Sequence, residues 1–198
     1  MRTLHGLYAI TPGHAARAPA PDPQGAEQER LAIATAGLVR QVELAIAGGA
    51  QVIQYRDKSG QAPADRERRL TEAHALRTLC AATGVPLIIN DDANLAAAVS
   101  ADGVHLGRDD PSPTVARRRL GHAAIIGVSC YNRLDLAEAA QAAGADYVAF
   151  GSFFSSSTKP LAVRADLQLL RRARQRIRLP LVAIGGITPE NGAALIAA

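Results

Sequence analysis

The chain has 198 residues, of which 48% are hydrophobic and 20% charged, with 17 glycines, 11 prolines and no tryptophan. This apolar share excludes an intrinsically disordered chain, and the length predicts a single domain over residues 1–198. The formal net charge of +4 leaves nucleic acid, an anionic membrane surface or anionic small molecules open as partners.

Several features narrow the possible partners and the cellular compartment. The arginines between 171 and 178 fall on a predicted helix without interleaved aromatic residues, so a solvated helix face is favoured over a nucleic-acid site. No run of about 18 apolar residues occurs, and the N-terminus lacks the long apolar stretch of a secretory signal. The two cysteines, Cys80 and Cys130, lack metal-binding spacing. We expect a cytoplasmic protein with reduced thiols and with neither nucleic acid nor membrane as a partner.

Short apolar runs alternate with amphipathic stretches along the whole chain, which is typical of βαβ units. Strands are expected at 7–10, 52–55, 86–89, 103–106, 124–128, 147–150 and 181–184. Helices are expected through 31–46, 70–80, 93–99, 112–120, 136–143, 166–178 and 188–198. Residues 13–26, rich in alanine, proline and glycine, are expected to form an exposed, flexible loop.

This alternation predicts a parallel α/β fold, either an open doubly wound sheet or a closed (β/α)8 TIM barrel. An open sheet concentrates function at one switch point, whereas a barrel gathers residues from nearly every strand end. Polar residues follow almost every predicted strand, which favours the TIM barrel. The sequence ends at Ala198 within the seventh predicted helix, so we expect the eighth strand to be missing.

The candidate chemistry of the first half follows the second, third and fourth predicted strands. Alternation puts Gln54, Arg56 and Lys58 on one side, where an amide suits a heterocycle edge and two cations suit phosphate oxygens. Solvated charges at a strand end are the alternative. The carboxylates of 91–92 and 109–110 follow neighbouring strands. They could hold a Mg²⁺ ion whose coordination shell is completed by phosphate oxygens. Helix capping and a general acid–base pair are the alternatives for these carboxylates.

The second half offers hydroxyl groups and backbone amides. Ser129 ends the fifth strand and could donate to a phosphate; no histidine lies near it in sequence, which disfavours a nucleophile. His105 is expected to be a hydrogen-bonded core residue rather than a catalytic one. The serine-rich stretch before Lys159 is a candidate anion-binding loop. Gly185 and Gly186 precede Thr188 and Pro189, the expected start of the seventh helix, and their amides could bind phosphate there.

Taken together, seven segments closely resemble the thiamine-phosphate synthases, and they span almost the whole chain. The matching segments are LYAITP (7–12), QYRDK (54–58), PLIINDD (86–92), ADGVHLGRDD (101–110), IIGVS (125–129), GADYVAFGSFFSSSTKP (144–160) and LPLVAIGGITPEN (179–191). Enzymes of that family condense 4-amino-2-methyl-5-(diphosphooxymethyl)pyrimidine with 4-methyl-5-(2-phosphoethyl)thiazole to thiamine phosphate and diphosphate. The resemblance therefore implies a transferase of thiamine biosynthesis with phosphorylated small-molecule substrates; it leaves a homo-oligomer open.

The resemblance also implies residue roles. Substrate-binding residues would be Gln54, Tyr55, Arg56, Asp57, Lys58, Asn90, Ser129, Ser156, Ser157, Thr158, Lys159 and Gly186. Among these, Arg56, Ser129 and Lys159 would be catalytic. Asp91 and Asp110 would bind Mg²⁺, the implied cofactor, with Asp109 as the alternative to Asp110.

The implied reaction is a dissociative substitution in which Mg²⁺ and cationic side chains stabilise the departing diphosphate. Three other interpretations stay open. A Schiff-base aldolase barrel would use Lys58 or Lys159 as its amine. A thiazole tautomerase-like barrel would lack condensation chemistry, and an inactive protein would bind thiamine phosphate without releasing diphosphate.

Overall fold

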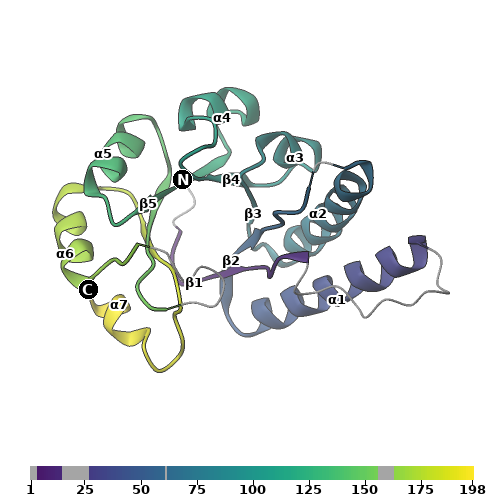
Figure 1. Cartoon of the computed structure of the whole chain (residues 1–198), viewed down its shortest axis with the longest axis horizontal. Coiled ribbons are helices and arrows are strands. Elements are labelled where there is room, and N and C mark those ends of the chain that lie inside the picture. The colour runs from purple at the N-terminus through teal and green to yellow at the C-terminus, as the bar shows by residue number, and fades with distance from the viewer. Residues whose placement is uncertain (1–3, 15–26, 61, 156–162) are drawn as a thin grey trace. The chain divides into compact units, whose positions relative to one another are not determined.

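Strands and helices alternate strictly along the chain in the computed structural model, which describes residues 4–14, 27–60, 62–155 and 163–198 (Figure 1). Seven strands and seven helices lie in these ranges, as the hydrophobic pattern predicts. The chain forms two compact units, an N-terminal unit of Leu4–Val104 and a C-terminal unit of His105–Ala198. Most of the flexible loop expected at 13–26 lies outside the described residues.

The N-terminal unit is built on three parallel strands. Its elements are β1 (Leu7–Ile10), α1 (Glu27–Ala47), β2 (Ala50–Tyr55), α2 (Pro63–Thr83), β3 (Leu87–Asn90) and α3 (Ala93–Ala98). Strand β2 pairs with β1 on one side and with β3 on the other. Ile53, Leu87 and Ile88 are fully buried, as continuous apolar strands of a covered parallel sheet should be. Helices α1 and α2 lie side by side (Figure 1).

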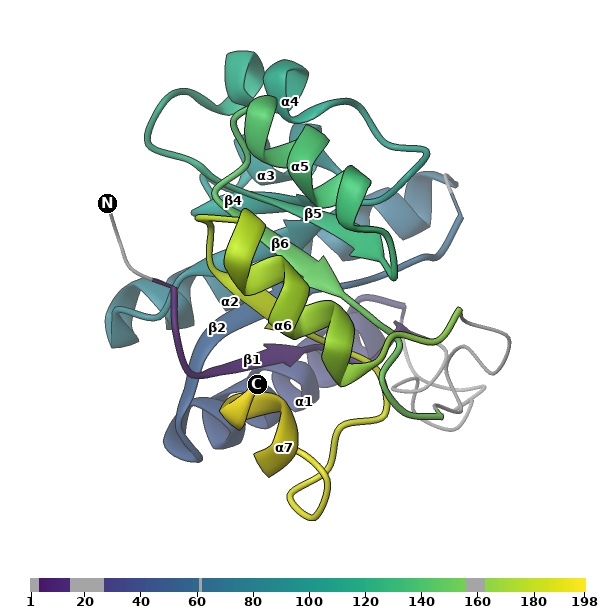
Figure 2. The same cartoon turned by 90° about the vertical axis from the view of Figure 1, so that its left-hand side faces the viewer.

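Strand β4 (Gly103–Leu106) spans the boundary between the units, and the C-terminal unit continues the same rhythm. Its elements are α4 (Pro113–Leu120), β5 (Ile125–Tyr131), α5 (Leu134–Ala142), β6 (Tyr147–Phe150), α6 (Leu167–Arg176), β7 (Leu181–Ala183) and α7 (Ala193–Ala197). Strands β5, β6 and β7 pair in parallel. Figure 2 shows α5 and α6 as neighbours, with α5 packed on β5 and β6 and α6 packed on β7.

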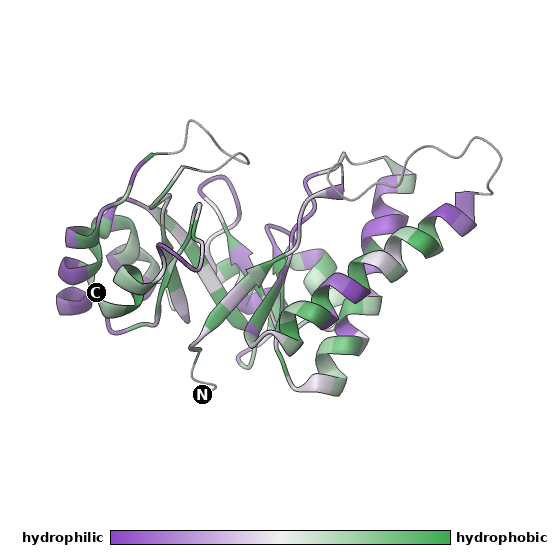
Figure 3. Ribbon diagram, turned by 90° about the horizontal axis from the view of Figure 1, so that it is seen from below, coloured by the Kyte–Doolittle hydropathy of each residue, from purple (hydrophilic) through white to green (hydrophobic). Residues whose placement is uncertain are grey.

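The arginines of helix α6 lie on a solvent-exposed face, which confirms the prediction from the sequence. Leu169, Leu170 and Ala173 are buried in the core of the C-terminal unit, whereas Arg172 and Arg174 are exposed. Figure 3 shows the same division more widely, since strands are mostly hydrophobic while helices carry both hydrophilic and hydrophobic stretches. None of the helices in the described ranges is long and apolar enough to cross a membrane.

The start of the seventh helix differs from the prediction. Thr188 and Pro189 were expected as its cap and first residue, but α7 begins only at Ala193. The Thr188 N–H donates to Asn191 Oδ1 at 2.8 Å, and the Asn191 and Gly192 N–H groups donate to the Thr188 carbonyl. Because the asparagine side chain closes this turn, the helix starts after it.

Candidate functional site

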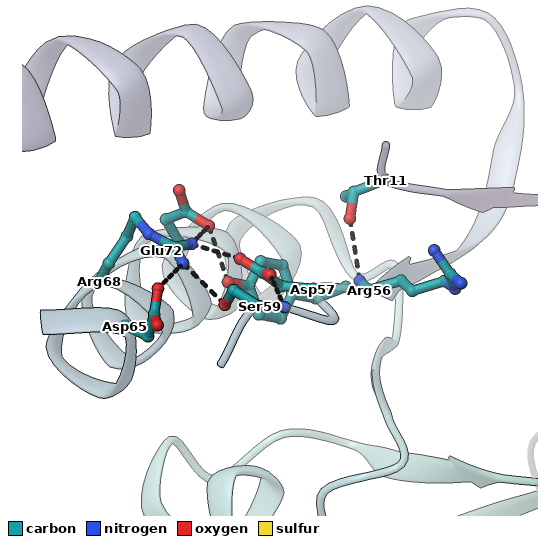
Figure 4. A network of polar contacts seen from close by, with 8 residues as sticks. Thr11, Arg56, Asp57, Ser59, Asp65, Arg68 and Glu72 are labelled. Atoms are coloured by element: carbon teal, nitrogen blue, oxygen red, sulfur yellow. Dashed lines mark hydrogen bonds and ion pairs between the residues drawn. The ribbon is translucent and has the colours of Figure 1, made fainter. Parts of the chain in front are cut away.

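Residues 54–58 at the end of β2 divide their side chains between two environments, as strand alternation requires. Tyr55 Oη donates to Glu72 Oε2 at 2.7 Å, and Asp57 accepts from Arg68 and from the Ser59 N–H. Figure 4 shows the Asp57 side chain turned toward the Arg68 of α2 while the Arg56 side chain extends the opposite way.

Arg68 is the centre of the buried network. Its guanidinium pairs with Asp57 and with Asp65 at 2.9 Å, lies 3.8 Å from Glu72 and donates to Ser59 Oγ at 2.8 Å. Burial by itself would raise the pKa of Asp57, but the hydrogen bonds from Arg68 and from the Ser59 N–H outweigh burial and lower that pKa below 3.8. The network therefore holds the Asp57 carboxylate ionised.

Tyr55 and Asp57, implied by resemblance as substrate-binding residues, both belong to this network. Tyr55 is 1% exposed and Asp57 9% exposed. The structure thus separates their side chains from those of Arg56 and Lys58 and ties them to α2 instead. Their contacts anchor the segment to the helix behind it.

The other side of the segment carries polar groups with spare hydrogen-bonding capacity. The Gln54 Nε2 group donates to Tyr8 Oη at 2.9 Å, which leaves a second N–H and the carbonyl oxygen of the amide. Arg56 is anchored through its backbone, because its N–H donates to Thr11 Oγ1 at 2.9 Å. The Arg56 guanidinium forms no hydrogen bond or ion pair with any residue that the structure describes. Such a cation is available to an anionic ligand.

The end of β3 distributes two adjacent carboxylates between two tasks. Asp92 caps α3, since Oδ1 accepts from the Leu95 N–H at 2.8 Å, and Oδ2 accepts from Arg69 at 2.7 Å. Asp91 has a left-handed backbone with φ of 64°, and its Oδ2 lies 2.6 Å from Lys58 Nζ. The capping interpretation is therefore confirmed for Asp92, whereas Asp91 belongs with Asn90 and Lys58 at the strand end.

In the C-terminal unit, Asp110 is fixed by the loop that follows β4. Its Oδ2 accepts from the Gly107 N–H at 2.6 Å, while Ser112, not Asp110, caps α4. Asp110 and Ser129 both border a cavity of about 330 Å³ within this unit. The Arg108 guanidinium lies 4.9 Å from the centre of the Tyr131 ring at the same cavity.

The fold brings His105 to Ser129, a contact that the sequence interpretation missed. His105 Nε2 lies 2.8 Å from Ser129 Oγ, and His105 Nδ1 lies 2.9 Å from Tyr147 Oη. His105 is 6% exposed, which confirms a buried, hydrogen-bonded histidine. The signal in the sequence is the inward position of His105 on β4 and the position of Ser129 on β5, because strand partners can meet across long sequence separations.

Two positions after β7 require glycine, because atoms of Ser152 and Ser155 lie too close for a side chain. Gly185 and Gly186 have φ of 102° and 63°, and a Cβ on Gly186 would lie 2.2 Å from the Ser155 carbonyl oxygen. Because α7 has five residues and begins at Ala193, any anion here would meet loop amides rather than a helix N-terminus. The predicted residues Ser156, Ser157, Thr158 and Lys159 lie outside the described residues.

The donor set for a metal is sparse. No group of three or more His, Cys, Asp or Glu side chains that could hold a metal occurs within residues 4–14, 27–60, 62–155 and 163–198. Asp91 lies in the N-terminal unit and Asp110 in the C-terminal unit. The described residues therefore offer no all-protein cage for a metal ion.

Comparison with known proteins places this chain among relatives over most of its length. Residues 27–198 match the family model described as thiamine monophosphate synthase. The thiamine-phosphate synthase of Thiobacillus denitrificans is 59% identical over 82% of this chain and 75% of its own length. That of Azoarcus sp. is 52% identical over 98% of this chain and 84% of its own length.

Solved structures agree. A thiamine phosphate pyrophosphorylase from Pyrococcus furiosus matches with a TM-score of 0.75 and 32% identity, covering 96% of this chain and 80% of that one. A 3-dehydroquinate dehydratase from Geobacillus kaustophilus shares the fold at a TM-score of 0.60 and 17% identity. The predicted α/β barrel class and the predicted enzyme class, a transferase of thiamine biosynthesis, are thereby confirmed. The chain belongs to the thiamine monophosphate synthase family.

Proposed function

We propose that the chain joins the diphosphorylated hydroxymethylpyrimidine to the thiazole phosphate, forming thiamine phosphate and releasing diphosphate. The observation that carries this proposal is the Arg56 guanidinium, which pairs with no residue that the structure describes, while the opposite side of the same segment is bonded to α2. Relatives at 52% and 59% identity carry the name of this activity.

In the N-terminal unit, the pyrimidine and its diphosphate are assigned to different groups. The remaining N–H and carbonyl of Gln54, together with Asn90, suit the nitrogen-rich edge of a pyrimidine. Arg56 and Lys58 suit diphosphate oxygens, and Arg56 can bind two of them at once. Tyr55 and Asp57 act as positioning residues, because their bonds to Glu72 and Arg68 fix the segment.

In the C-terminal unit, Ser129 is assigned to the pyrimidine substrate. The loop residues Ser156, Ser157 and Thr158 and the backbone amide of Gly186 are assigned to the thiazole phosphate. Lys159 is assigned to the departing diphosphate as a catalytic residue with Arg56. These assignments follow from the resemblance of the segments, with the tight backbone of Gly186 as support.

Mg²⁺ fits the carboxylates that the chain offers. Mg²⁺ prefers one or two carboxylates with substrate phosphate oxygens and waters over an all-protein cage. Asp91 and Asp110 are the carboxylates that the resemblance assigns to the ion, and they would hold it. When bound, the ion neutralises charge that develops on the leaving diphosphate.

The chain's own residues then have an electrostatic task. Cleavage of the C–O bond leaves a delocalised pyrimidine-methyl cation and moves the bonding electron pair onto the diphosphate, where Arg56, Lys58 and Lys159 stabilise it. The thiazole nitrogen supplies the electron pair of the new C–N bond. It carries no proton, so no general base and no covalent enzyme intermediate are required.

Lys58 disfavours the aldolase alternative. A Schiff-base lysine needs a neutral amine in a desolvated pocket. The Lys58 side chain is instead 53% exposed, and its Nζ lies 2.6 Å from the Asp91 carboxylate. An ammonium group that is exposed and ion-paired suits phosphate binding better than attack on a carbonyl.

The direct test mixes both phosphorylated substrates with the protein and Mg²⁺ and measures thiamine phosphate by oxidation to its fluorescent product, with diphosphate release measured in parallel. We expect equal amounts of both products and loss of turnover with EDTA that added Mg²⁺ restores. Thiamine phosphate binding without diphosphate release would contradict the proposal and support an inactive binding protein. Metal-independent isomerisation of the thiazole substrate would support the tautomerase-like alternative.

Asp91→Asn tests the assigned metal carboxylate without disturbing the backbone, because asparagine tolerates the left-handed conformation at this position. We expect the Mg²⁺ concentration for half-maximal rate to rise by about tenfold or more, as for loss of a charged ligand. Asp92→Asn is the matched control, since Asp92 caps α3 and faces Arg69. An unchanged Mg²⁺ requirement in Asp91→Asn would remove Asp91 from the metal site.

A further inference from the structure

Three side chains of the C-terminal unit form a continuous polar line across β4, β5 and β6. Tyr147 Oη lies 2.9 Å from His105 Nδ1, and His105 Nε2 lies 2.8 Å from Ser129 Oγ. Tyr147 is fully buried and His105 almost so, whereas Ser129 is partly exposed and borders the cavity of about 330 Å³. The line therefore runs from the core to a residue that is partly exposed.

The core end of this line is held firmly. The Tyr147 and His105 rings stack with centres 5.6 Å apart and an interplanar angle of 27°. Tyr147 pairs with Gly127 in the β5–β6 register, and a Cβ on Gly127 would lie 1.9 Å from the tyrosine ring. The absence of a side chain at Gly127 thus leaves the space that the Tyr147 ring occupies. With two fixed neighbours, the imidazole has little freedom to rotate.

Hydrogen-bond directions along the line follow from the chemistry of a neutral imidazole, which has one N–H donor and one acceptor nitrogen. A phenol is a stronger proton donor than an aliphatic hydroxyl, which favours the tautomer in which Tyr147 donates to Nδ1. In that tautomer the imidazole proton resides on Nε2 and is donated to Ser129 Oγ. Because this donor then occupies one side of the serine oxygen, the Ser129 O–H is directed away from His105.

We infer that His105 is a positioning residue that fixes the rotamer of Ser129 and directs its O–H toward the substrate. This inference rests on the proposed function, in which Ser129 contacts the pyrimidine substrate. A serine next to a histidine also resembles a nucleophile with its base. Here the imidazole offers an N–H to Oγ and no lone pair to its proton, so Ser129 serves as a hydrogen-bond donor.

The hydrogen-bond directions can be tested without turnover. In ¹⁵N-histidine-labelled protein, long-range ¹H–¹⁵N spectra should show His105 as the Nε2–H form, assigned by the signal that disappears in His105→Gln. The chain has five histidines, so assignment is tractable. Tyr147→Phe should alter the tautomer balance of His105, because the donor to Nδ1 is removed. A Nδ1–H form in the unmodified protein would overturn the proposed directions.

Kinetics test the positioning role with two matched variants. His105→Gln can keep a polar group near the Nε2 position, whereas His105→Asn keeps one only near Nδ1. We expect His105→Asn to lower kcat about 10- to 100-fold, with a smaller change in KM and little change in Tm, and His105→Gln to retain activity within about threefold of the unmodified enzyme. In a Ser129→Ala background, His105→Asn should have no further effect, because both changes remove one interaction.

Several outcomes would contradict the inference. These are unchanged kcat in His105→Asn, equal losses in the Gln and Asn variants, and effects of His105→Asn and Ser129→Ala that multiply. If the unmodified protein makes no thiamine phosphate, the proposed function fails, and the tautomer result still decides the hydrogen-bond directions.

Discussion

Arg56 and Arg68 lie twelve positions apart in the same unit, yet they have opposite surroundings. Arg68 is 8% exposed and pairs with Asp57 and Asp65, with Glu72 nearby. The Arg56 guanidinium meets no carboxylate within the described ranges of the chain. A buried cation needs compensation from the protein, whereas a cation left without it has its charge available to a ligand. The contrast distinguishes Arg68, which anchors the segment to α2, from Arg56, whose charge we propose binds a ligand.

The largest expected effect comes from Arg56→Ala. We expect kcat/KM to fall by about 10²- to 10³-fold, as for loss of one preorganised donor to developing charge. The Tm should stay within about 1 °C of the unmodified protein, because only a side chain without described partners is removed. Steady-state kinetics and a thermal melt measure both. Full activity in this variant would remove Arg56 from the site.

Arg68→Ala should show the reverse order of effects. Removal of the guanidinium leaves buried acidic groups uncompensated, so we expect a loss of about 3–5 kcal/mol in the free energy of unfolding. For a chain of this length that is a decrease in Tm of about 10 °C. Arg66→Ala, a change at an exposed position of the same helix, is the control. A stable, fully active Arg68→Ala variant would refute the structural role.

Asp57→Asn sharpens the comparison by removing one charge of the network. We expect a loss of about 1–3 kcal/mol at pH 7, from a weakened buried hydrogen bond. The folded state lowers the pKa of Asp57 below 3.8, so the contribution of the carboxylate is present above about pH 4 and is lost as the pH falls through the folded pKa. Urea unfolding at pH 7 and pH 3 should therefore show a difference between variant and unmodified protein that shrinks at the lower pH. A difference independent of pH would contradict the assigned charge state.

The smallest effect concerns Cys80, which is buried on α2. Burial raises the pKa of the Cys80 thiol to about 12, so the native thiol should react slowly with a disulfide reagent at pH 8. In a Cys130→Ala background, Arg56→Ala should leave this rate within about twofold, whereas Arg68→Ala should increase it by loosening α2. Faster labelling in Arg56→Ala would show that Arg56 also supports the fold.

Much of this arrangement could be predicted from the sequence. Apolar runs located all seven strands because continuous hydrophobic segments have no stable alternative to burial in a covered sheet. Strand alternation separated Gln54, Arg56 and Lys58 from Tyr55 and Asp57. The resemblance grouped all five as substrate-binding residues, and it gave no sign of the contacts that Tyr55 and Asp57 make with Glu72 and Arg68.

Other features depend on tertiary contacts. The Arg68 network joins a strand end to the next helix, and nothing in the spacing of Asp57 and Arg68 requires their contact. The line from Tyr147 through His105 to Ser129 joins three strands. The delayed start of α7 reflects a side-chain bond of Asn191 that competes with a proline signal for helix initiation. Each outcome is decided by partners distant from the local pattern.

Gly127 gives this fold a constraint on how its sequence can drift. The tyrosine ring fills the volume that any side chain at position 127 would need, so even an alanine there would displace it. A larger residue at 127 becomes acceptable only after the aromatic ring at 147 has been replaced. That replacement also removes the hydrogen bond between Tyr147 and His105. In related or redesigned chains, Gly127 and Tyr147 should therefore either both be conserved or both be substituted.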